Sequence, residues 1–504
     1  MGNTDQIPTF TTPREDDLFL GSSFGLHSYG DLKQFERFFL QFLFDFDHSF
    51  EKPVGFLAPS SDTLIFAITA CWNLGIPFVS FDTKATSEEL DRQLEQVDPG
   101  LVFVGQELQS KINHPDAIDI KQLDIKRSLE IDVMLGFEAK NFNPKTDPDN
   151  IFGYFFTSGT TTGTPKIVPL KRRQMLFAAK ASAENFKPRK NHFWLLCLPL
   201  NHIGGISIIL RSLLYGSAIF RMKSFHPKMI TTFLTENKLF QAASLVPTML
   251  NRLLERSGFF VHQNFKAILL GGGPIDTNLI KECRNKGIPL VPSYGMTETC
   301  AQIAANPILK PSGTYGPLKS VGTVFEPNRI QIRDENDETV SINTAGEIWI
   351  KGPQVFDGYL QLDNKDFFDA DGWYRTGDFG YFNAKKQLFI DSRRSDRIIT
   401  GGENVSPFEV ESKLNELKDI DESAVFGISD KEWGQKVVAA VVTEKGRSIN
   451  PVTIQEDLKQ ILADYKVPKE IIQVEELPKT RTDKVIRSKL PELFLERAKQ
   501  SEKS

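Results

Sequence analysis

Cysteine is scarce in this chain, which has four cysteines among 504 residues. Cys71, Cys197, Cys283 and Cys300 lie far apart, and no two of them form the Cys-x-x-Cys spacing of zinc sites. This distribution excludes a disulfide framework and a cysteine-based zinc site. Reduced thiols in a cytoplasmic enzyme are expected instead, because that compartment keeps isolated thiols reduced.

A surplus of positive charge is also missing. Lysine and arginine number 60 against 65 aspartates and glutamates, which gives a net charge of -5. The basic clusters at residues 171–173 and 393–394 are too short to form the positive surface of a nucleic-acid-binding protein. No nucleic-acid partner is therefore expected.

Long apolar runs are the third absence. The most apolar long stretch, residues 203–220, contains Arg211 and three glycines, and it falls short of the ~20 apolar residues that span a bilayer. The first ten residues are polar and lack a signal core, and Gln6 stands where a myristoylation signal has serine or threonine. The sequence thus predicts no membrane span and no acyl anchor. Residues 203–220 are expected to form a core helix that leads into a strand.

The first 300 residues alternate between strand and helix patterns. Short apolar runs at 54–58, 77–81 and 101–104 are separated by amphipathic stretches at 62–74 and 87–96. Such alternation predicts a parallel sheet covered by helices on both faces. A second series of similar runs follows between residues 194 and 292. Phenylalanine is abundant, at 40 residues, and is expected first of all to fill these cores, although it could also line an apolar acid pocket.

Beyond about residue 310 the pattern changes to alternating strands and turns, which is typical of a β-rich subdomain. A charged connector at residues 392–396 then leads into a final α+β segment of about 110 residues, a usual domain size. The predicted fold class is α/β, with a large N-terminal domain of parallel-sheet α/β subdomains plus a β-rich subdomain, and a small α+β C-terminal domain. The predicted boundary divides the chain into 1–394 and 395–504.

A loop rich in hydroxyl groups and glycines follows the buried-strand pattern at residues 151–156. Its backbone N–H groups, its hydroxyls and one ammonium can converge on a phosphate. The candidate ligands are Thr157, Ser158, Gly159, Thr160, Thr161, Thr162, Gly163 and Lys166. The spacing excludes a Walker loop, which needs four residues between its glycines, followed by Gly-Lys-Ser/Thr. A glycine-rich surface loop without a ligand is the alternative.

Three further segments place polar groups after predicted strands, where sites form in α/β proteins. His202 precedes a glycine pair, and it would be an ordinary loop histidine if considered alone. The strip Gly271, Gly272 and Gly273 could let a flat ring lie against bare backbone, although a tight turn is the simpler explanation. The segment 294–298 offers an aromatic ring, hydroxyls and a carboxylate, contributed by Tyr294, Gly295, Met296, Thr297 and Glu298.

Three charged residues complete the set of candidates. Asp378 follows a turn glycine and could accept hydrogen bonds from two ribose hydroxyls. Arg393 and Lys484, each considered alone, would be interpreted as ordinary surface cations. Glu298 could hold Mg2+ against a nucleotide phosphate, because Mg2+ prefers oxygen ligands. Each segment has an ordinary structural explanation when it is considered by itself. Their order along one chain is what carries information.

In this order the segments resemble the adenylate-forming superfamily of acyl- and aryl-CoA ligases, peptide-synthetase adenylation domains and luciferases. The resemblance extends over essentially the whole chain and rests on residues 157–166, 294–298, 374–378, 392–405 and Lys484. Two features differ from the family pattern. Three residues separate Gly159 from Gly163 where the family usually has two, and Asp483 stands where glycine is more common.

The resemblance implies a role for most of the candidates. It assigns the β- and γ-phosphates of ATP to the loop 157–166, Mg2+ to Glu298, and the ribose to Asp378 and Arg393. The adenine ring would lie between residues 271–273 and Tyr294, beside Gly295, Met296 and Thr297. Lys484 would bridge the substrate carboxylate and the α-phosphate, and His202 and Glu298 are the other candidate catalytic residues. ATP, Mg2+ and coenzyme A are thus the expected cofactors and co-substrates.

The implied reaction agrees with the chemistry of these side chains. A carboxylic acid is already ionised at neutral pH, so its attack on ATP needs charge neutralisation and alignment rather than a general base. The thiol of coenzyme A then attacks the acyl-adenylate. In the family the small C-terminal domain rotates between the two steps, which here implies a mobile domain with its hinge at Ser395 and with Gly401-Gly402-Glu403 moving toward the acyl site.

The acid is suggested by finer resemblance. Residues 271–302 and the connector 393–396 are similar to those of o-succinylbenzoate-CoA ligases of menaquinone biosynthesis. A medium-chain or aryl acid is the alternative substrate. Three other functions stay open: a nucleotide-binding protein without turnover, a ligase that loads a carrier-protein thiol, and an oxygen-dependent luciferase. The sequence leaves the oligomeric state open as well.

The role implied for Lys484 gives a first prediction. Lys484→Ala should impair adenylate formation much more than thioester formation from supplied adenylate, because the ammonium acts on the α-phosphate. Pyrophosphate release and thioester formation, measured separately, test this expectation. Equal losses in both half-reactions would refute the division of labour.

Overall fold

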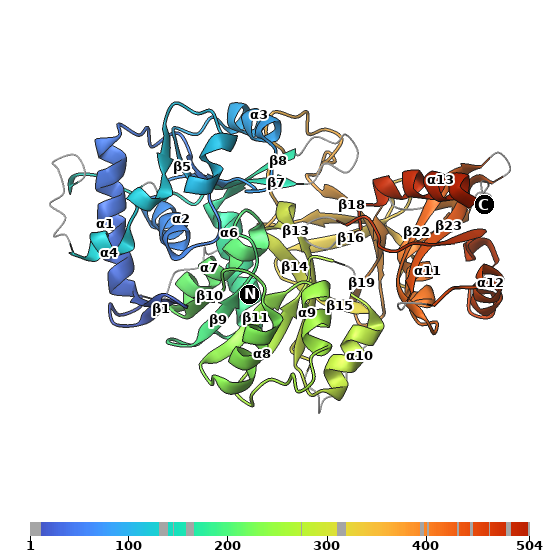
Figure 1. The fold of residues 1–504 in the computed structure, drawn as a ribbon. Helices are drawn as coiled ribbons and strands as arrows, with labels where there is room; N and C mark the ends of the chain where they lie inside the picture. Colours follow the sequence, from blue (N-terminus) through green and yellow to red (C-terminus); the bar gives the residue numbers. More distant parts are fainter. Residues whose placement is uncertain are drawn as a thin grey trace.

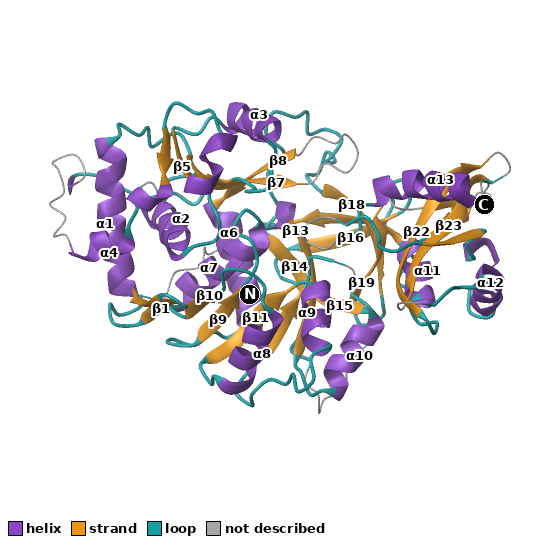
Figure 2. Cartoon of the chain, viewed as in Figure 1, coloured by secondary structure: helices purple, strands orange, loops and turns teal. Residues whose placement is uncertain are grey.

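The computed structural model describes most of the chain. The described residues are 12–130, 140–144, 146–157, 166–273, 275–309, 319–393, 398–400, 403–430, 433–443, 447–462, 464–479 and 485–501. They form three sheets with helices packed on them (Figures 1 and 2). Several predicted features fall outside this part: residues 158–163, the boundary at 394/395, Ser395, Gly401, Gly402, Asp483 and Lys484.

The N-terminal sheet has six strands in the order β6-β5-β3-β4-β7-β8. Its first five strands are parallel, and β8 pairs antiparallel with β7. The strands are β3 (Val54–Leu57), β4 (Phe78–Ser80), β5 (Leu101–Val104), β6 (Ala117–Asp119), β7 (Ile151–Thr157) and β8 (Lys166–Lys171). Around them lie the helices α1 (Tyr29–Asp45), α2 (Asp62–Leu74), α3 (Ser87–Val97) and α4 (Ile125–Glu130). The predicted strand–helix alternation is confirmed here.

Local sequence signals explain the bounds of individual helices. The N-terminus of α3 is closed by a capping box, in which the Glu89 N–H donates to Thr86 Oγ1 at 3.2 Å and the Thr86 N–H donates to Glu89 Oε2 at 2.8 Å. The helix α7 (Ile203–Tyr215) ends at Gly216, whose φ of 63° is the left-handed conformation that glycine adopts without a steric cost. The strand β10 (Ala218–Arg221) follows at once, so the helix-to-strand prediction for residues 203–220 is confirmed.

A second sheet of 13 strands runs through the middle of the chain in the order β16-β17-β18-β19-β15-β14-β13-β12-β11-β9-β10-β1-β2. The neighbours from β13 to β1 pair in parallel. The parallel strands besides β10 are β1 (Leu18–Ser22), β9 (Phe193–Leu196), β11 (Phe240–Leu245), β12 (Ala267–Leu270) and β13 (Leu290–Met296). Beside these strands lie α6 (Arg172–Phe186), α7, α8 (Pro227–Glu236), α9 (Pro247–Leu254) and α10 (Thr277–Asn285).

The β-rich segment continues this second sheet instead of forming a sheet of its own. Its strands pair antiparallel, and β14 joins them to the parallel half by pairing with β13. They are β14 (Ala301–Ala305), β15 (Ser320–Val324), β16 (Arg329–Arg333), β17 (Gly346–Lys351), β18 (Tyr374–Phe382) and β19 (Leu388–Arg393), while β2 (Gly25–Ser28) closes the opposite edge. The continuous hydrogen bonding connects the parallel and antiparallel halves firmly.

The third sheet belongs to the C-terminal segment, coloured orange to red at one side of the molecule in Figure 1. Its path is β21-β20-β23-β22, and β24 pairs with β23. The elements are β20 (Ile398–Thr400), β21 (Glu403–Val405), β22 (Ile420–Asp430), β23 (Gly434–Thr443), β24 (Glu470–Gln473), α11 (Pro407–Leu414), α12 (Pro451–Lys459) and α13 (Leu490–Ser501). The α/β fold class with an α+β C-terminal part is therefore confirmed.

The main apolar core includes α6 and α7, which pack against one another between the two large sheets. Helix α6 contacts β8 of the first sheet and β14 of the second, and α7 contacts β9 and β10. Phenylalanines fill much of the buried interior, as predicted, and they include Phe19, Phe35, Phe39, Phe56, Phe66, Phe78, Phe103 and Phe152. The four cysteines are free and buried. Within the described helices, none combines the length and the apolar character that a membrane crossing needs.

His48 gives the core a dependence on pH. Its side chain is buried, and burial lowers the pKa of the imidazole to about 4. In the unfolded chain the pKa is near 6.5, so the unfolded state binds the proton that the folded state excludes. This contribution to stability is complete above about pH 6.5 and is lost as the pH falls toward 4.

His48→Gln should remove this dependence. Between pH 7 and pH 5 the wild-type protein should lose about 2 kcal/mol more unfolding free energy than the variant. Urea unfolding at the two pH values measures the difference, with exposed His226→Gln as the control. Parallel losses in wild type and His48→Gln would contradict the assignment.

Candidate active site

Two predicted nucleotide ligands meet where the parallel half of the large sheet joins the antiparallel half. The Tyr294 hydroxyl, near the end of β13, donates a hydrogen bond to Asp378 Oδ2 in β18 at 2.7 Å. Both side chains are buried, at 8% and 4% exposure. In the sequence they are 84 residues apart. The sheet thus brings the candidates for adenine and ribose contact to one place.

The turn that follows β13 has little steric freedom. A Cβ at Gly295 would lie 1.6 Å from the Ala301 carbonyl oxygen, so glycine alone fits at this position. Cys300 and Ala301 adopt φ values of 54° and 80°, which reverses the chain into β14. The Met296 N–H donates to Thr299 Oγ1 at 3.1 Å. Residues 297–299 form a single 3-10 turn, η3 (Thr297–Thr299), which fixes the direction of Glu298.

Glu298 is buried, with 8% of its surface exposed. Its Oε1 accepts a hydrogen bond of 2.7 Å from the Tyr359 hydroxyl, which lies 3.1 Å from the Tyr374 hydroxyl. The Glu298 carbonyl accepts from the Phe356 N–H at 2.9 Å. Burial raises the pKa of Tyr374 well above its usual value, and the nearby Glu298 charge adds to that effect. Tyr374 therefore stays a neutral hydroxyl near this carboxylate.

Lys166 is the first residue of β8 and lies opposite Thr157, the last residue of β7. Its ammonium nitrogen lies over two aromatic rings, 4.7 Å from the Tyr359 centroid and 4.1 Å from the Phe367 centroid. Burial lowers the pKa of Lys166, and the Glu298 charge opposes that shift. The strand pair thus places Thr157 and Lys166 opposite one another, at the two ends of the predicted phosphate loop. The other loop candidates, Ser158, Gly159, Thr160, Thr161, Thr162 and Gly163, lie outside the described residues.

The glycine strip follows β12, which neighbours β13. A Cβ at Gly271 would lie 2.8 Å from Ser293 Oγ, and Gly272 has a φ of 78°. The Ser293 hydroxyl donates to the Leu270 carbonyl at 2.9 Å, which holds the two strand ends together. Bare backbone therefore lies next to the strand that carries Tyr294, as an adenine-binding strip requires.

The remaining candidates are placed less completely. His202 is exposed at the residue before α7, and its catalytic role stays a prediction. Arg393 pairs in register with Asp378 through the β18–β19 ladder. Lys484 lies outside the described residues, but the chain on either side is fixed by the antiparallel bridge between Lys479 and Val485. The structure thus brings Tyr294 together with Asp378, and it brings Lys166 and Glu298 to the same side chain, Tyr359.

The arrangement is compatible with a bound Mg2+ ion. Among the described residues there is no group of three or more His, Cys, Asp and Glu side chains that could enclose a metal. Mg2+ does not need one, because it keeps several waters and binds through one or two carboxylates together with substrate phosphates. Glu298, oriented by Tyr359, could supply such a carboxylate beside a phosphate-binding loop.

Two features of the site were missed in the sequence. One is the pair Tyr359 and Phe367, whose only signal is the aromatic-rich segment between β17 and β18. The other is Arg211, whose signal is a lone charge inside the most apolar stretch. The Arg211 side chain is 1% exposed and lies 4.4 Å over the Trp194 ring, and burial lowers its pKa to about 9. Within the described residues it forms no ion pair, and its hydrogen-bond partners are the hydroxyls of Ser182 and Ser244.

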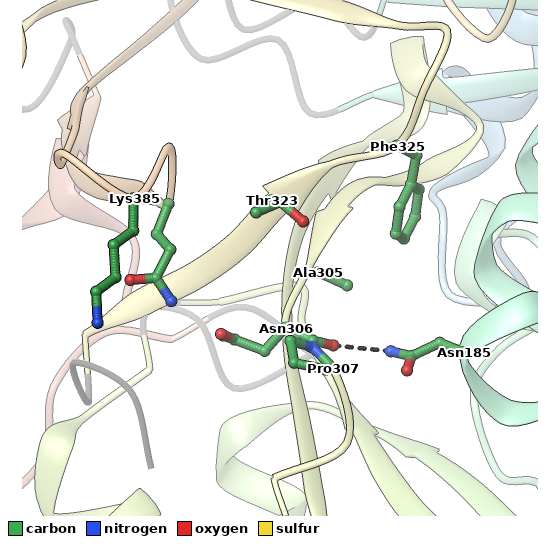
Figure 3. A pocket seen from close by; sticks show the side chains of 8 residues that line it. Asn185, Ala305, Asn306, Pro307, Thr323, Phe325 and Lys385 are labelled. Carbon is green, nitrogen blue, oxygen red and sulfur yellow. Dashed lines mark hydrogen bonds between the residues drawn. The ribbon is translucent and has the colours of Figure 1, made fainter. Parts of the chain in front are cut away.

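A separate pocket of about 450 Å³ lies away from these residues, at the far end of β14 (Figure 3). Figure 3 shows Asn185 of α6 pointing toward Asn306, whose carbonyl accepts its amide hydrogen at 2.7 Å. The lining residues are Asn185, Ala305, Asn306, Pro307, Thr323, Phe325, Lys385 and Gln387. None of them belongs to the candidate site.

The bond between Tyr294 and Asp378 yields a prediction on nucleotide binding. Asp378→Asn should weaken ATP binding at least tenfold, because a charged acceptor contributes more than a neutral amide. Tyr294→Phe should cost about twofold to threefold, because Asp378 keeps its charge and loses only an orienting donor. Equilibrium titration with ATP measures both, with exposed Asp371→Asn as the matched control. Unchanged affinity in Asp378→Asn would remove Asp378 from the nucleotide site.

Comparisons with known proteins agree with this arrangement. A family model described as AMP-binding enzyme matches residues 14–360, and the AMP-binding enzyme C-terminal domain matches residues 409–484. The 2-succinylbenzoate--CoA ligase of Enterococcus faecalis is 35% identical over 438 residues, which cover 86% of this chain and 87% of that protein. The corresponding ligase of Bacillus subtilis is 33% identical over 431 residues, covering 85% of each.

Solved structures show the same fold. The o-succinylbenzoate CoA synthetase (MenE) of Bacillus subtilis in complex with the acyl-adenylate intermediate OSB-AMP has a TM-score of 0.84 and 30% identity, covering 94% of this chain and 95% of that one. ATP-bound MatB of Rhodopseudomonas palustris has a TM-score of 0.86 at 23% identity, covering 96% and 97%, and shows likeness of fold alone. The chain therefore belongs to the AMP-binding enzyme family.

Proposed function

We propose that this protein joins o-succinylbenzoate to coenzyme A, with ATP as the energy source and an acyl-adenylate as the intermediate. The likeness that carries the proposal extends along nearly the full length of relatives named 2-succinylbenzoate--CoA ligase. The Bacillus subtilis synthetase has been solved with OSB-AMP, and also with ATP and a magnesium ion. An AMP-forming acid–thiol ligase is the reaction class. A place in menaquinone biosynthesis follows from this product.

The proposed first step forms the mixed anhydride. An oxygen of the ionised acid attacks the α-phosphorus of ATP, the bond to the bridging oxygen breaks, and pyrophosphate leaves. Tyr294 and the strip 271–273 would hold the adenine, while Asp378 and Arg393 would hold the ribose. Glu298 and the 157–166 loop would hold the charged end of the nucleotide. Bound Mg2+ would supply charge neutralisation there.

The proposed second step uses the same acyl site. The thiol sulfur of coenzyme A attacks the acyl carbon, AMP leaves with the electron pair of the broken C–O bond, and the thiol proton passes to solvent. Lys484 would align the first step and then withdraw with the C-terminal domain. Because ATP and coenzyme A are metabolites of the cytoplasm, a cytoplasmic location is part of the proposal.

Arg211 supports an acid with two carboxylates. O-succinylbenzoate carries two, and the one that is not adenylated remains charged. Among the residues that the structure describes, the partners of the buried Arg211 cation are neutral, and a buried charge without a counter-ion is costly. An anionic ligand group would offset that cost. A monocarboxylate, such as a medium-chain fatty acid, would leave it in place.

The position of Arg211 fits this role. Its partner Ser182 donates to the Gln302 side chain in β14. The Gln354 amide donates to the Thr299 carbonyl at 3.0 Å and also to the Gln302 carbonyl. Arg211 is therefore connected by one short network to the turn that carries Glu298. We infer that the second carboxylate lies between this network and the nucleotide.

A panel of acids tests the substrate. Pyrophosphate release should be fastest with o-succinylbenzoate, at least tenfold above benzoate and medium-chain fatty acids, and AMP should form with coenzyme A as the acceptor. Activity confined to fatty acids or to other aryl acids would overturn the substrate. Transfer of the acyl group only to a carrier-protein thiol would show that coenzyme A is not the acceptor. Nucleotide binding without pyrophosphate release would refute the enzymatic function.

Arg211 is tested in the same assay. Arg211→Met should lower kcat/KM for o-succinylbenzoate at least 100-fold, because a buried carboxylate loses its counter-ion, while ATP affinity stays within twofold. Arg211→Lys, which keeps the charge, should retain more of the activity and guards against a folding defect. An unchanged ratio between o-succinylbenzoate and benzoate in Arg211→Met would exclude Arg211 from acid recognition.

A further inference from the structure

One aromatic side chain contacts both of the charged groups that flank the predicted phosphate site. The hydroxyl of Tyr359 donates to Glu298 Oε1 at 2.7 Å, and the face of the same ring lies 4.7 Å below the Lys166 ammonium. Phe367 presents a second face to the ammonium at 4.1 Å. We call the rings of Tyr359 and Phe367 the aromatic shelf. The shelf lies between a cation and an anion that attract one another.

The shelf is fixed by its own contacts. The Phe367 ring meets Tyr359 nearly edge-on, with centroids 4.8 Å apart and an interplanar angle of 73°. Phe356 packs against Tyr359 at 4.8 Å and against Tyr374 at 5.0 Å. The Tyr359 N–H donates to Asn364 Oδ1 at 2.8 Å. These contacts leave the Tyr359 ring one well-defined orientation.

The backbone around the shelf is tied to both sides of the site. The Leu360 N–H donates to the Ile167 carbonyl at 3.0 Å, next to Lys166 in β8. The Phe356 N–H donates to the Glu298 carbonyl at 2.9 Å. The segment 356–360, which includes Tyr359, therefore connects strand β8 with the turn η3.

This geometry has a consequence for the metal. A lysine ammonium paired directly with the Glu298 carboxylate would compete with Mg2+ for the same oxygens. A ring face attracts the ammonium through its quadrupole and does not neutralise Glu298. The tyrosine hydroxyl occupies one carboxylate oxygen with a neutral donor and orients the other, as outer partners of metal ligands commonly do.

We propose that Tyr359 is a positioning residue for Mg2+ and ATP, which keeps Glu298 oriented for the metal and Lys166 close to it without an ion pair. The proposal rests on the proposed function for the role of Glu298 and Lys166. It adds a residue that acts through its contacts with these two charged groups. Phe367 completes the shelf and contacts Lys166, whereas the hydrogen bond to Glu298 comes from Tyr359.

Tyr359→Phe separates the hydroxyl from the ring face. It should raise the Mg2+ concentration needed for half-maximal binding of α,β-methylene-ATP about threefold to tenfold, because Glu298 loses its orienting donor. Binding of the analogue without Mg2+ should change less than twofold, because the ring still carries Lys166. Titration calorimetry measures both values without turnover. Tyr381→Phe, on the same strand as Asp378 but outside the site, is the matched control.

Phe367→Leu removes an aromatic ring below Lys166 and keeps the hydroxyl of Tyr359. It should leave the Mg2+ requirement within twofold of wild type and should weaken metal-free binding of the analogue about threefold to fivefold, because Lys166 loses part of its support. Phe367→Tyr should restore the binding. If either Tyr359→Phe or Phe367→Leu raised the Mg2+ requirement and also weakened metal-free binding of the analogue, the result would indicate general damage to the fold and would overturn the proposal.

A double-mutant cycle decides whether Tyr359 acts through Glu298. In the Glu298→Gln background, Tyr359→Phe should add no further loss of Mg2+-dependent binding, because residues that act through one group are not additive. Additive losses would overturn the proposal. These titrations contain no acid, so a wrong assignment of o-succinylbenzoate leaves their outcome unchanged. Absence of nucleotide binding in the wild type would instead refute the proposed function.

Discussion

The hydrogen bond between Tyr294 and Asp378 is the interaction on which the arrangement of the site depends. It joins the end of a parallel strand to an antiparallel strand that comes 84 residues later. The bond is possible because β14, β15 and β19 continue the ladder from β13 to β18 without a break. The Tyr294–Asp378 pair is therefore held within one sheet, whereas Thr157 and Lys166 come from the N-terminal sheet.

The charged groups of the site share a second constraint. Lys166, Glu298 and Arg211 lie close to ring faces or neutral hydroxyls, which hold their charges in place. A reaction that brings together ATP, a metal ion and an acid needs charges that remain available to the ligands. Neutral partners can orient such groups, and a ligand then does not have to break an ion pair in order to bind them. The same principle thus applies to the proposed phosphate, metal and acid sides of the site.

Much of the fold could be predicted from periodicity. The runs at 54–58, 77–81 and 101–104 became β3, β4 and β5, and the amphipathic stretches between them became α2 and α3. The capping box at Thr86 is a local feature as well, because its partner Glu89 lies only three residues away. The arrangement of the β-rich strands could not be predicted in this way, because β15 pairs with the distant strand β19, and such pairing leaves no local pattern in the sequence. The domain boundary at 394/395 and the position of Lys484 stay predictions.

By itself, the sequence determined the order of the chemical groups: a hydroxyl-rich loop, a glycine strip, a glutamate after a tyrosine, and a late lysine. Local composition sets these features, since a turn needs its glycine and a phosphate needs its donors. Tertiary structure alone decided which of these groups meet and what surrounds them. The aromatic shelf under Lys166 and the neutral surroundings of Arg211 arise from packing between distant segments, and such packing depends on the register of the whole sheet.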